Sequence, residues 1–235
     1  MIDQTEMKDR YRVVRDEINE AAAAAGRDPD DINLVAVSKF HPAERVLEAV
    51  GLGMTCFGEN QVQELVAKAA EVASAGLQPS WHMIGTLQRN KVRQVVGLVD
   101  LIHSVDSDRL LKEIDKRAGQ KACRQAVLLQ INYSGAGQKH GYSPTAARDS
   151  IVELLPTLPH VSLQGIMTMA EPDWTETETD AFYRDFAAYY QELKVTTGLN
   201  LPILSMGMSG DFQIAIRHGA THIRIGTSIF GQREY

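Results

Sequence analysis

The sequence predicts an α/β fold, a single (β/α)8 TIM-type barrel with an extra N-terminal helix. Eight short apolar segments alternate with helical patterns along 235 residues. This strict alternation implies parallel strands, because each connection must return across the sheet before the next strand begins. The length also falls in the range of ~200–250 residues over which α/β barrels form one domain. No linker divides the chain, so we expect residues 1–235 to form one domain, with residues 1–26 as a helix packed on the barrel.

The first two elements have clearly different patterns. Apolar residues from Met7 to Ala25 recur at helical spacing, and Gly26 is suited to end that helix. The segment 33–40 (NLVAVSKF) is short, apolar and rich in β-branched residues, which is typical of a strand buried on both faces. Seven further strands of this kind are predicted at 54–59, 81–85, 101–105, 126–132, 163–169, 203–208 and 222–225.

Helical patterns fill the intervals between the strands. Pro42 is suited to the first turn of one helix, and Ser143 followed by a proline is suited to open another. Asn60 is expected to cap the helix at 61–74. The other expected helices are the segment after Pro42, residues 90–99, 108–118 and 145–155, the aromatic segment 182–193, and residues 211–218.

An open, doubly wound sheet is the alternative to a barrel. No GxGxxG motif follows the first strand, which disfavours a dinucleotide-binding fold of that type. The eighth strand lacks a full helix after it, and we expect the N-terminal helix to cover part of the surface left exposed.

The composition excludes several classes of protein. A balance of 24 Lys and Arg against 30 Asp and Glu gives a net charge of −6, which argues against a broad nucleic-acid surface. Cys56 and Cys123 are too few for a disulfide framework, and we expect them to be buried structural thiols in a reducing compartment. No segment resembles a signal peptide or a membrane span. We therefore expect a cytoplasmic protein with no nucleic-acid or membrane partner.

Lys39 is the first candidate for chemistry. It closes an apolar strand at the end where barrels of this type place their active sites. Partial desolvation lowers the pKa of an amine, and a neutral amine can attack a carbonyl to form a Schiff base. The alternative is a lysine that emerges at a strand end and pairs with Glu59.

The second candidate is a phosphate cradle formed by residues 209–211 and 226–228. Loops after strands seven and eight form the usual phosphate site of this fold. Arg224 lies inside the eighth strand, where a fixed charge is costly and invites a functional explanation. The alternatives are a helix N-cap for Ser209 and an ion pair for Arg224. Together with Lys39, the cradle indicates an aldehyde phosphate that is held covalently.

The other polar segments carry weaker signals. No HxxxH or CxxC pair occurs, so we expect no dedicated metal site. His82 is expected to be a packed core histidine. Lys139 lies in a glycine-rich loop, residues 132–142, and is expected to be solvated; a role as a transient acceptor of an aldehyde is a hypothesis from its position alone.

Six motifs, taken in order, resemble the pyridoxal phosphate homeostasis proteins, the YggS/PROSC-like family. They are AVSK with Pro42 shortly after it, FGENQVQE, WHMIGTLQRNK, GIMTM, LSMGMSGD and IRIGTSIFGQREY. The resemblance extends from the first helix to Tyr235, and six ordered motifs are far more specific than any one. It implies a barrel similar to the N-terminal domain of alanine racemase, with pyridoxal 5'-phosphate (PLP) held as a Schiff base on Lys39.

The resemblance also implies the remaining cofactor-binding residues. Ser209, Gly226 and Thr227 would hold the phosphate, Arg224 would face the pyridine nitrogen, and Asn60 would lie in the same pocket. The implied function is vitamin B6 homeostasis, in which the protein carries or buffers PLP, with PLP-dependent apo-enzymes as further partners.

Two considerations favour binding over catalysis, so we expect no enzymatic activity. Arginine stays protonated, so Arg224 would donate a hydrogen bond to the ring nitrogen without giving it a proton, and the ring would be a weak electron sink. A racemase needs a second base, which the family analogy places as a tyrosine on another domain, and this chain ends soon after strand eight. A PLP-dependent amino-acid racemase or lyase of low activity, and a regulatory protein that uses PLP as a signal, remain alternatives. We expect a monomer, because no extra interface domain is present.

Overall fold

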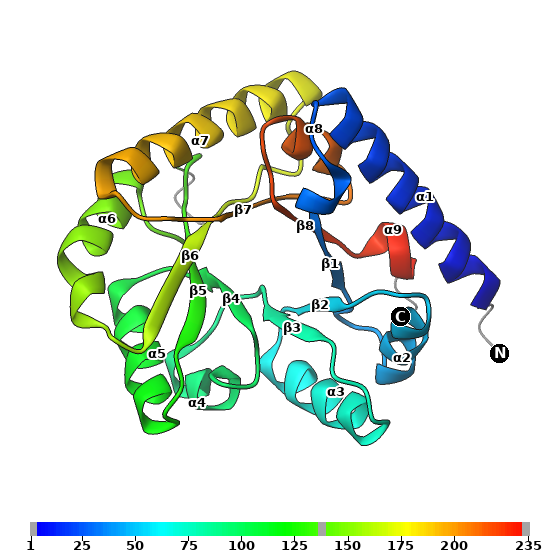
Figure 1. Cartoon of the computed structure of the whole chain (residues 1–235), viewed down its shortest axis with the longest axis horizontal. Helices are drawn as coiled ribbons and strands as arrows, with labels where there is room; N and C mark the ends of the chain where they lie inside the picture. Colours follow the sequence, from blue (N-terminus) through cyan, green and yellow to red (C-terminus); the bar gives the residue numbers. More distant parts are fainter. Residues whose placement is uncertain (1–3, 136–139, 232–235) are drawn as a thin grey trace.

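Eight parallel strands close into a barrel in the computed structural model, which describes residues 4–135 and 140–231 (Figure 1). Each strand pairs with the next, and β1 pairs with both β2 and β8, so the ring is closed and the open sheet is excluded. The predicted fold class is confirmed. The strands are β1 (Asn33–Val37), β2 (Cys56–Glu59), β3 (Ser80–Met83), β4 (Leu101–Val105), β5 (Gln125–Gln130), β6 (Val161–Met167), β7 (Ile203–Met208) and β8 (His222–Ile225).

Helices surround the barrel on its outer side (Figure 1). They are α1 (Gln4–Ala24), α2 (Ala43–Gly51), α3 (Val62–Ser74), α4 (Val92–Val95), α5 (Asp108–Gln120), α6 (Pro144–Asp149), α7 (Glu176–Thr197), α8 (Phe212–Arg217) and α9 (Thr227–Phe230). None of the helices in the described ranges is long and apolar enough to cross a membrane.

Local sequence signals account for several helix ends. Thr175 and Glu178 form a capping box at the start of α7, in which each side chain accepts a hydrogen bond from the other residue's backbone amide. Gly198 ends the same helix with a left-handed backbone, φ 67°, which glycine adopts without a steric penalty. The Ser143 side chain caps α6, as predicted.

Three predicted elements are shorter or less regular than their patterns suggested. β1 ends early, because Phe40 adopts a left-handed backbone (φ 67°) and the chain turns away from the sheet. Within residues 90–99 a 3-10 turn (Arg89–Lys91) leads into the short α4, and the chain turns at Gly97 (φ 72°). The predicted helix 145–155 passes from α6 into a π-helical segment and ends in a 3-10 turn at Pro156, which lacks the amide needed to continue the helix.

α1 lies across α8 and α9, beside the strand that lacks a full helix (Figure 1). Its buried side chains include Met7 and Ile18. After α1, Arg27 Nη1 donates to the carbonyls of Ile216 (2.9 Å) and Ala220 (2.8 Å), at and just beyond the end of α8. This helix therefore covers part of the barrel that the short α9 leaves open, as expected.

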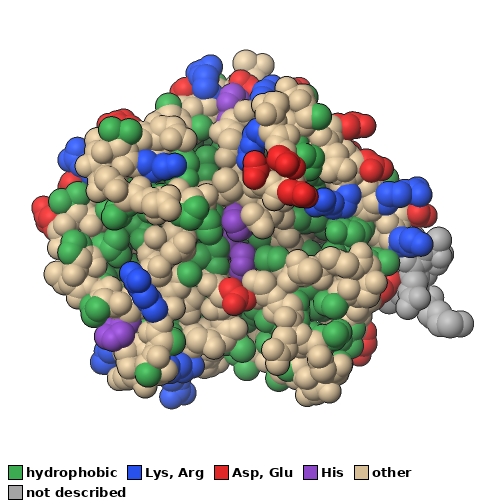
Figure 2. Space-filling model, in the orientation of Figure 1, with side chains coloured by type: hydrophobic (Ala, Val, Ile, Leu, Met, Phe, Trp, Pro, Cys, Tyr) green, Lys and Arg blue, Asp and Glu red, His purple; other side chains and the backbone are tan. Residues whose placement is uncertain are grey.

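Apolar side chains form one large core between the sheet and the helices and a small cluster of Leu101, Leu128 and Met167 from β4, β5 and β6. Alternate side chains of barrel strands point inward. Polar side chains of β3, β4, β7 and β8 therefore share the interior with the small cluster, and histidine side chains are visible at the centre of the face drawn in Figure 2. A polar barrel interior is what positions the candidate site.

Candidate functional site

A cavity of about 570 Å³ opens at the carboxyl ends of the strands. Its volume falls in the range of small-molecule sites, roughly 300–1,000 Å³. The structure brings together in its wall all six residues that the sequence nominated for cofactor binding. They are Lys39, Asn60, Ser209, Arg224, Gly226 and Thr227, which follow or end β1, β2, β7 and β8.

Lys39 follows β1 by one residue and is half-buried, and the backbone on both sides of it is held by side chains of α3. The carbonyl of Ser38 accepts a hydrogen bond from Lys68 Nζ at 2.7 Å. The amide of Phe40 donates to Glu64 Oε2 at 2.9 Å. Because a left-handed backbone is sparsely populated for a residue such as Phe40, this bond stabilises a turn that would otherwise be strained. The direction in which Lys39 leaves the backbone is thereby restricted.

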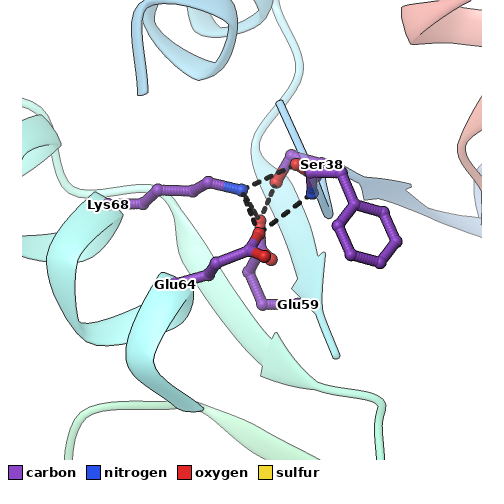
Figure 3. Close-up of polar contacts among 5 residues, drawn as sticks. Ser38, Glu59, Glu64 and Lys68 are labelled. Carbon is purple, nitrogen blue, oxygen red and sulfur yellow. Dashed lines mark hydrogen bonds and ion pairs between the residues drawn. The ribbon is translucent and has the colours of Figure 1, made fainter. Parts of the chain in front are cut away.

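Four side chains form a buried network beneath this turn, here called the Lys68 clamp: Ser38, Glu59, Glu64 and Lys68 (Figure 3). Glu59 Oε1 accepts from Ser38 Oγ at 2.6 Å and from Lys68 Nζ at 2.7 Å. Lys68 also donates to Glu64 Oε2 at 3.1 Å, so its three bonds match the three hydrogens of an ammonium group.

Burial and charge act in opposite directions on the two carboxylates of the clamp. Burial raises the pKa of Glu59, although the Lys68 ammonium and the Ser38 hydroxyl favour its ionised form. Burial also acts to raise the pKa of Glu64, but the bonds from the Phe40 amide and Lys68 outweigh it and lower that pKa. The carboxylate that the sequence offered as a partner for Lys39 is thus engaged by Lys68 and Ser38.

Asn60, which follows β2, lies against Gly85, which follows β3. A Cβ at Gly85 would stand 2.2 Å from the carbonyl oxygen of Asn60, so only glycine permits this approach of the two backbones. The predicted helix cap at Asn60 is wrong, because Gln61 occupies the N-cap position of α3. Asn60 Oδ1 is buried and has no hydrogen-bond partner among the described residues. A buried acceptor in this state is costly, which suits it to a ligand that supplies a donor.

Arg224 is a buried residue that lines the cavity. Its guanidinium donates to Ser205 Oγ and to the carbonyl of Thr168, the latter at 3.0 Å. No carboxylate of the described residues forms an ion pair with it, and the nearby Asp211 accepts instead from the Tyr183 hydroxyl at 2.8 Å. Burial lowers the pKa of Arg224, and Tyr183 and Asp211 oppose this shift. The ion pair considered for Arg224 is therefore absent from the described structure, and its positive charge is available to a ligand.

The loops after β7 and β8 meet beside the cavity. Asp211, not Ser209, is the N-cap of α8, and its Oδ1 accepts from the Met208 amide at 2.6 Å. The N-cap alternative for Ser209 is therefore wrong. Ser209 Oγ lies 3.4 Å from the Gly226 amide, which joins the two loops. Thr227 is the first residue of α9, so its amide has no partner within the helix.

Several residues at the site were missed by sequence reasoning. Lys68 carried only the signal of a Glu64–Lys68 pair four residues apart, which is common on exposed helix surfaces. His41 lines the cavity and stacks on Phe230, with ring centroids 5.3 Å apart. Other lining residues that were not nominated include Ile84, Thr86, Gln130 and His140.

Three other sequence expectations have mixed outcomes. His82 is buried, as predicted. Cys56 and Cys123 are free and partly buried, so they are more exposed than the buried structural thiols that were expected. Burial raises the pKa of Cys56 to about 12, which makes it a poor nucleophile. Lys139 lies outside the described residues.

Comparisons with known proteins agree with the motifs. The family model described as "Alanine racemase, N-terminal domain" matches residues 2–234. The pyridoxal phosphate homeostasis protein of Pseudomonas aeruginosa is 41% identical over 218 residues, which cover 93% of this chain and 92% of that protein. This chain belongs to the pyridoxal phosphate homeostasis protein family. The family member of Aquifex aeolicus is 38% identical over 229 residues, covering 97% of this chain and 98% of its own.

Solved structures of relatives share the fold. PipY of Synechococcus elongatus, solved with PLP bound, has a TM-score of 0.81 and 38% identity, covering 91% of this chain and 100% of its own. Alanine racemase of Clostridium difficile has a TM-score of 0.72 at 15% identity, over 95% of this chain and 57% of the racemase. At that identity the similarity to the racemase shows the barrel fold alone.

Proposed function

We propose that this protein binds PLP in the cavity at the carboxyl ends of its strands and carries or buffers it for the cell. The observation that carries the proposal is the convergence on one cavity of Lys39, the two loops after β7 and β8, and a buried Arg224 that forms no ion pair within the described ranges. The PLP-bound structure of PipY, a relative at 38% identity, supports the choice of ligand.

The residues present fit this cofactor. PLP supplies an aldehyde that condenses with a lysine amine with loss of one water, and a pyridine ring that can draw electrons from the bonded carbon. Lys39 would supply the amine, from a backbone turn held by the Lys68 clamp. Ser209, Gly226 and Thr227 would hold the phosphate with hydroxyl and amide donors, and Asn60 would accept a hydrogen bond within the same cavity.

Arg224 supports a binding role over a catalytic one. Its guanidinium is a permanent donor, so it would bond the ring nitrogen while leaving that nitrogen without a proton of its own. The titratable side chains that line the described cavity are Lys39, His41, His140 and Arg224, with no tyrosine or carboxylate among them. The described part of the cavity therefore lacks the tyrosine that the racemase analogy requires; His41 and His140 are the lining side chains that a racemase or lyase would have to use as its second base.

The proposal also covers the compartment, the oligomeric state and the partners of the protein. We propose a cytoplasmic monomer that delivers PLP to PLP-dependent apo-enzymes. A net charge of −6 and two unpaired cysteines are consistent with a reducing compartment and with the absence of a nucleic-acid partner.

The test is covalent trapping on the whole protein. Purified protein is incubated with PLP, reduced with borohydride and mapped by peptide mass spectrometry beside Lys39→Ala and the matched control Lys121→Ala. Lys121 bonds the Val96 carbonyl and does not line the cavity. We expect the pyridoxyl adduct on Lys39 in wild type and Lys121→Ala, and its loss in Lys39→Ala. An adduct spread over many lysines would contradict a specific site. Steady turnover of an amino acid that requires Lys39 would favour the racemase or lyase alternative.

A further inference from the structure

A chain of hydrogen bonds leads from the cavity wall into the barrel interior. Arg224 Nη1 donates to Ser205 Oγ, which lies 3.0 Å from His103 Nδ1. His103 Nε2 lies 3.0 Å from His82 Nδ1. These residues belong to β8, β7, β4 and β3 and are 5%, 0%, 0% and 6% exposed, so the chain crosses the barrel away from solvent.

The guanidinium at one end sets the direction of every bond. Arginine has donors only, so Ser205 Oγ accepts from Arg224. Among the described residues the one other partner of the Ser205 hydroxyl is His103 Nδ1, so the arrangement that also uses the hydroxyl hydrogen is donation from Ser205 Oγ to His103 Nδ1. A neutral His103 then carries its proton on Nε2 and donates to His82 Nδ1. His82 in turn carries its proton on Nε2, which lies 3.5 Å from Cys56 Sγ.

The imidazoles remain uncharged in this environment. Burial, together with the neighbouring imidazoles and Arg224, holds the pKa of His103 well below its ordinary value. Burial lowers the pKa of His82 to about 4, and burial with the charge of Arg224 does the same for His222, whose ring lies beside both others. Arg224 is therefore fixed in place by neutral groups, where a buried arginine is more often paired with a carboxylate.

We propose that Ser205, His103 and His82 are positioning residues that orient Arg224 toward the ring nitrogen of the ligand without neutralising its charge. A carboxylate in place of Ser205 would hold the guanidinium equally well but would compete with the ligand for its positive charge. Charge-assisted donors make the stronger hydrogen bonds, so a neutral relay keeps Arg224 an effective donor toward an uncharged acceptor. This proposal takes the identity of the ligand, PLP, from the proposed function.

The first arm of the test needs no ligand. Imidazole ¹⁵N chemical shifts of the full-length protein at neutral pH report which nitrogen carries the proton. We expect His103 and His82 both to be neutral with the proton on Nε2. In Ser205→Ala the constraint on His103 is lost, and we expect a mixture of its two tautomers. A wild-type His103 that carries its proton on Nδ1, or that is charged, would overturn the relay.

The second arm measures equilibrium binding of PLP and of its analogue in which a C–H group replaces the ring nitrogen. Wild type is compared with Ser205→Ala and with Ser150→Ala, which removes a buried hydroxyl outside the relay. We expect Ser205→Ala to reduce the preference for PLP over the analogue by about tenfold, as loss of a bond to a charged group implies. Ser150→Ala should leave the preference unchanged.

The two arms separate the possible failures. Equal loss of affinity for both ligands in Ser205→Ala would mean a general structural role and would refute positioning of Arg224. If wild type bound neither ligand, the proposed function would fail, and the tautomers measured in the first arm would still decide whether the relay exists.

Discussion

Replacement of Lys68 by methionine tests whether the clamp beneath Lys39 is an essential buried ion pair. Lys68 Nζ lies 2.7 Å from both Glu59 Oε1 and the Ser38 carbonyl and 3.1 Å from Glu64 Oε2. Methionine retains much of the aliphatic stem of Lys68 but removes the charge and all three donors. Glu59, which is 0% exposed, would then keep only the Ser38 hydroxyl as a described hydrogen-bond donor.

The expected cost follows from that burial. Removal of one partner of a buried ion pair typically destabilises a protein by about 3–5 kcal/mol, because the remaining charge is left without compensation. A loss of this size is a large part of a typical unfolding free energy of about 5–15 kcal/mol. If the charge on Glu59 is the cause, the double variant Glu59→Gln/Lys68→Met should be more stable than the sum of the single changes predicts, by about 2 kcal/mol.

The assay is urea denaturation followed by circular dichroism at pH 8 and at pH 5. In Lys68→Met the folded pKa of Glu59 should lie further above its unfolded value of about 4.3. The unfolded chain then loses its proton first as the pH rises, so the penalty grows between the two pKa values and should be larger at pH 8 than at pH 5. Arg117→Met is the matched control, because its pair with Glu113 is partly exposed and worth less than about 1 kcal/mol. A loss for Lys68→Met that is no greater than for Arg117→Met, or that is independent of pH, would refute this reasoning.

Three further predictions concern stability. Gly85→Ala places a Cβ 2.2 Å from the Asn60 carbonyl, so we expect a loss of at least about 2 kcal/mol in thermal or urea unfolding. His82 and His222 have folded pKa values of about 4, below the unfolded value of about 6.5. As the pH falls through this window the unfolded chain takes up the proton first, so each histidine lowers the free energy of unfolding, by on the order of 3 kcal/mol at pH 4. Urea midpoints measured across that range test this. Tyr183→Phe removes the hydrogen bond to the acid that caps α8, and we expect a loss of about 1 kcal/mol in the same assay.

Each of these predictions has a control in the same chain. A Cβ at Gly51 meets no atom within 4 Å, so Gly51→Ala should be tolerated where Gly85→Ala is not. His82→Gln should make the acid dependence of stability less steep, and an unchanged slope would count against the histidine assignment. The Tyr133 hydroxyl bonds the Asp185 carbonyl at the surface, so Tyr133→Phe should change stability by less than about 0.5 kcal/mol.

The strands were predictable because a strand buried on both faces appears in sequence as an apolar run. The segment 33–40 shows both the strength and the limit of this signal. The strand is present, but it ends at Val37, and a left-handed turn at Phe40 precedes α2. Such a turn depends on the bond from the Phe40 amide to Glu64, a contact between separate elements that local pattern does not contain. Closure of the barrel is of the same kind, because it rests on pairing between β1 and β8.

The meeting of the six nominated residues at one cavity has a geometric reason, whereas their roles toward a cofactor stay predictions that rest on the resemblance. Parallel strands in a barrel all end at one rim, so polar residues at those ends gather without any knowledge of register. The relay from Arg224 to His82 was not predictable, because it depends on the register by which β3, β4, β7 and β8 bring inward-facing side chains to the same depth. A single histidine within an apolar strand gives the same sequence pattern whether its side chain packs in a core or takes part in a chain of hydrogen bonds.

The Lys68 clamp and the relay around Arg224 support two residues of the cavity wall by different electrostatic means, and the difference bears on function. Beneath Lys39, one ammonium bonds two carboxylates and a backbone carbonyl, and these contacts fix the turn from which Lys39 projects. Around Arg224, neutral groups fix the side chain and leave its charge for the ligand. If the proposed function holds, Arg224 would donate a hydrogen bond to the ring nitrogen of the cofactor without protonating it. Lys39, on a turn held by the Lys68 clamp, would bond the aldehyde. Strong attachment combined with a weak electron sink is the combination expected of a protein that stores a reactive aldehyde and releases it unchanged.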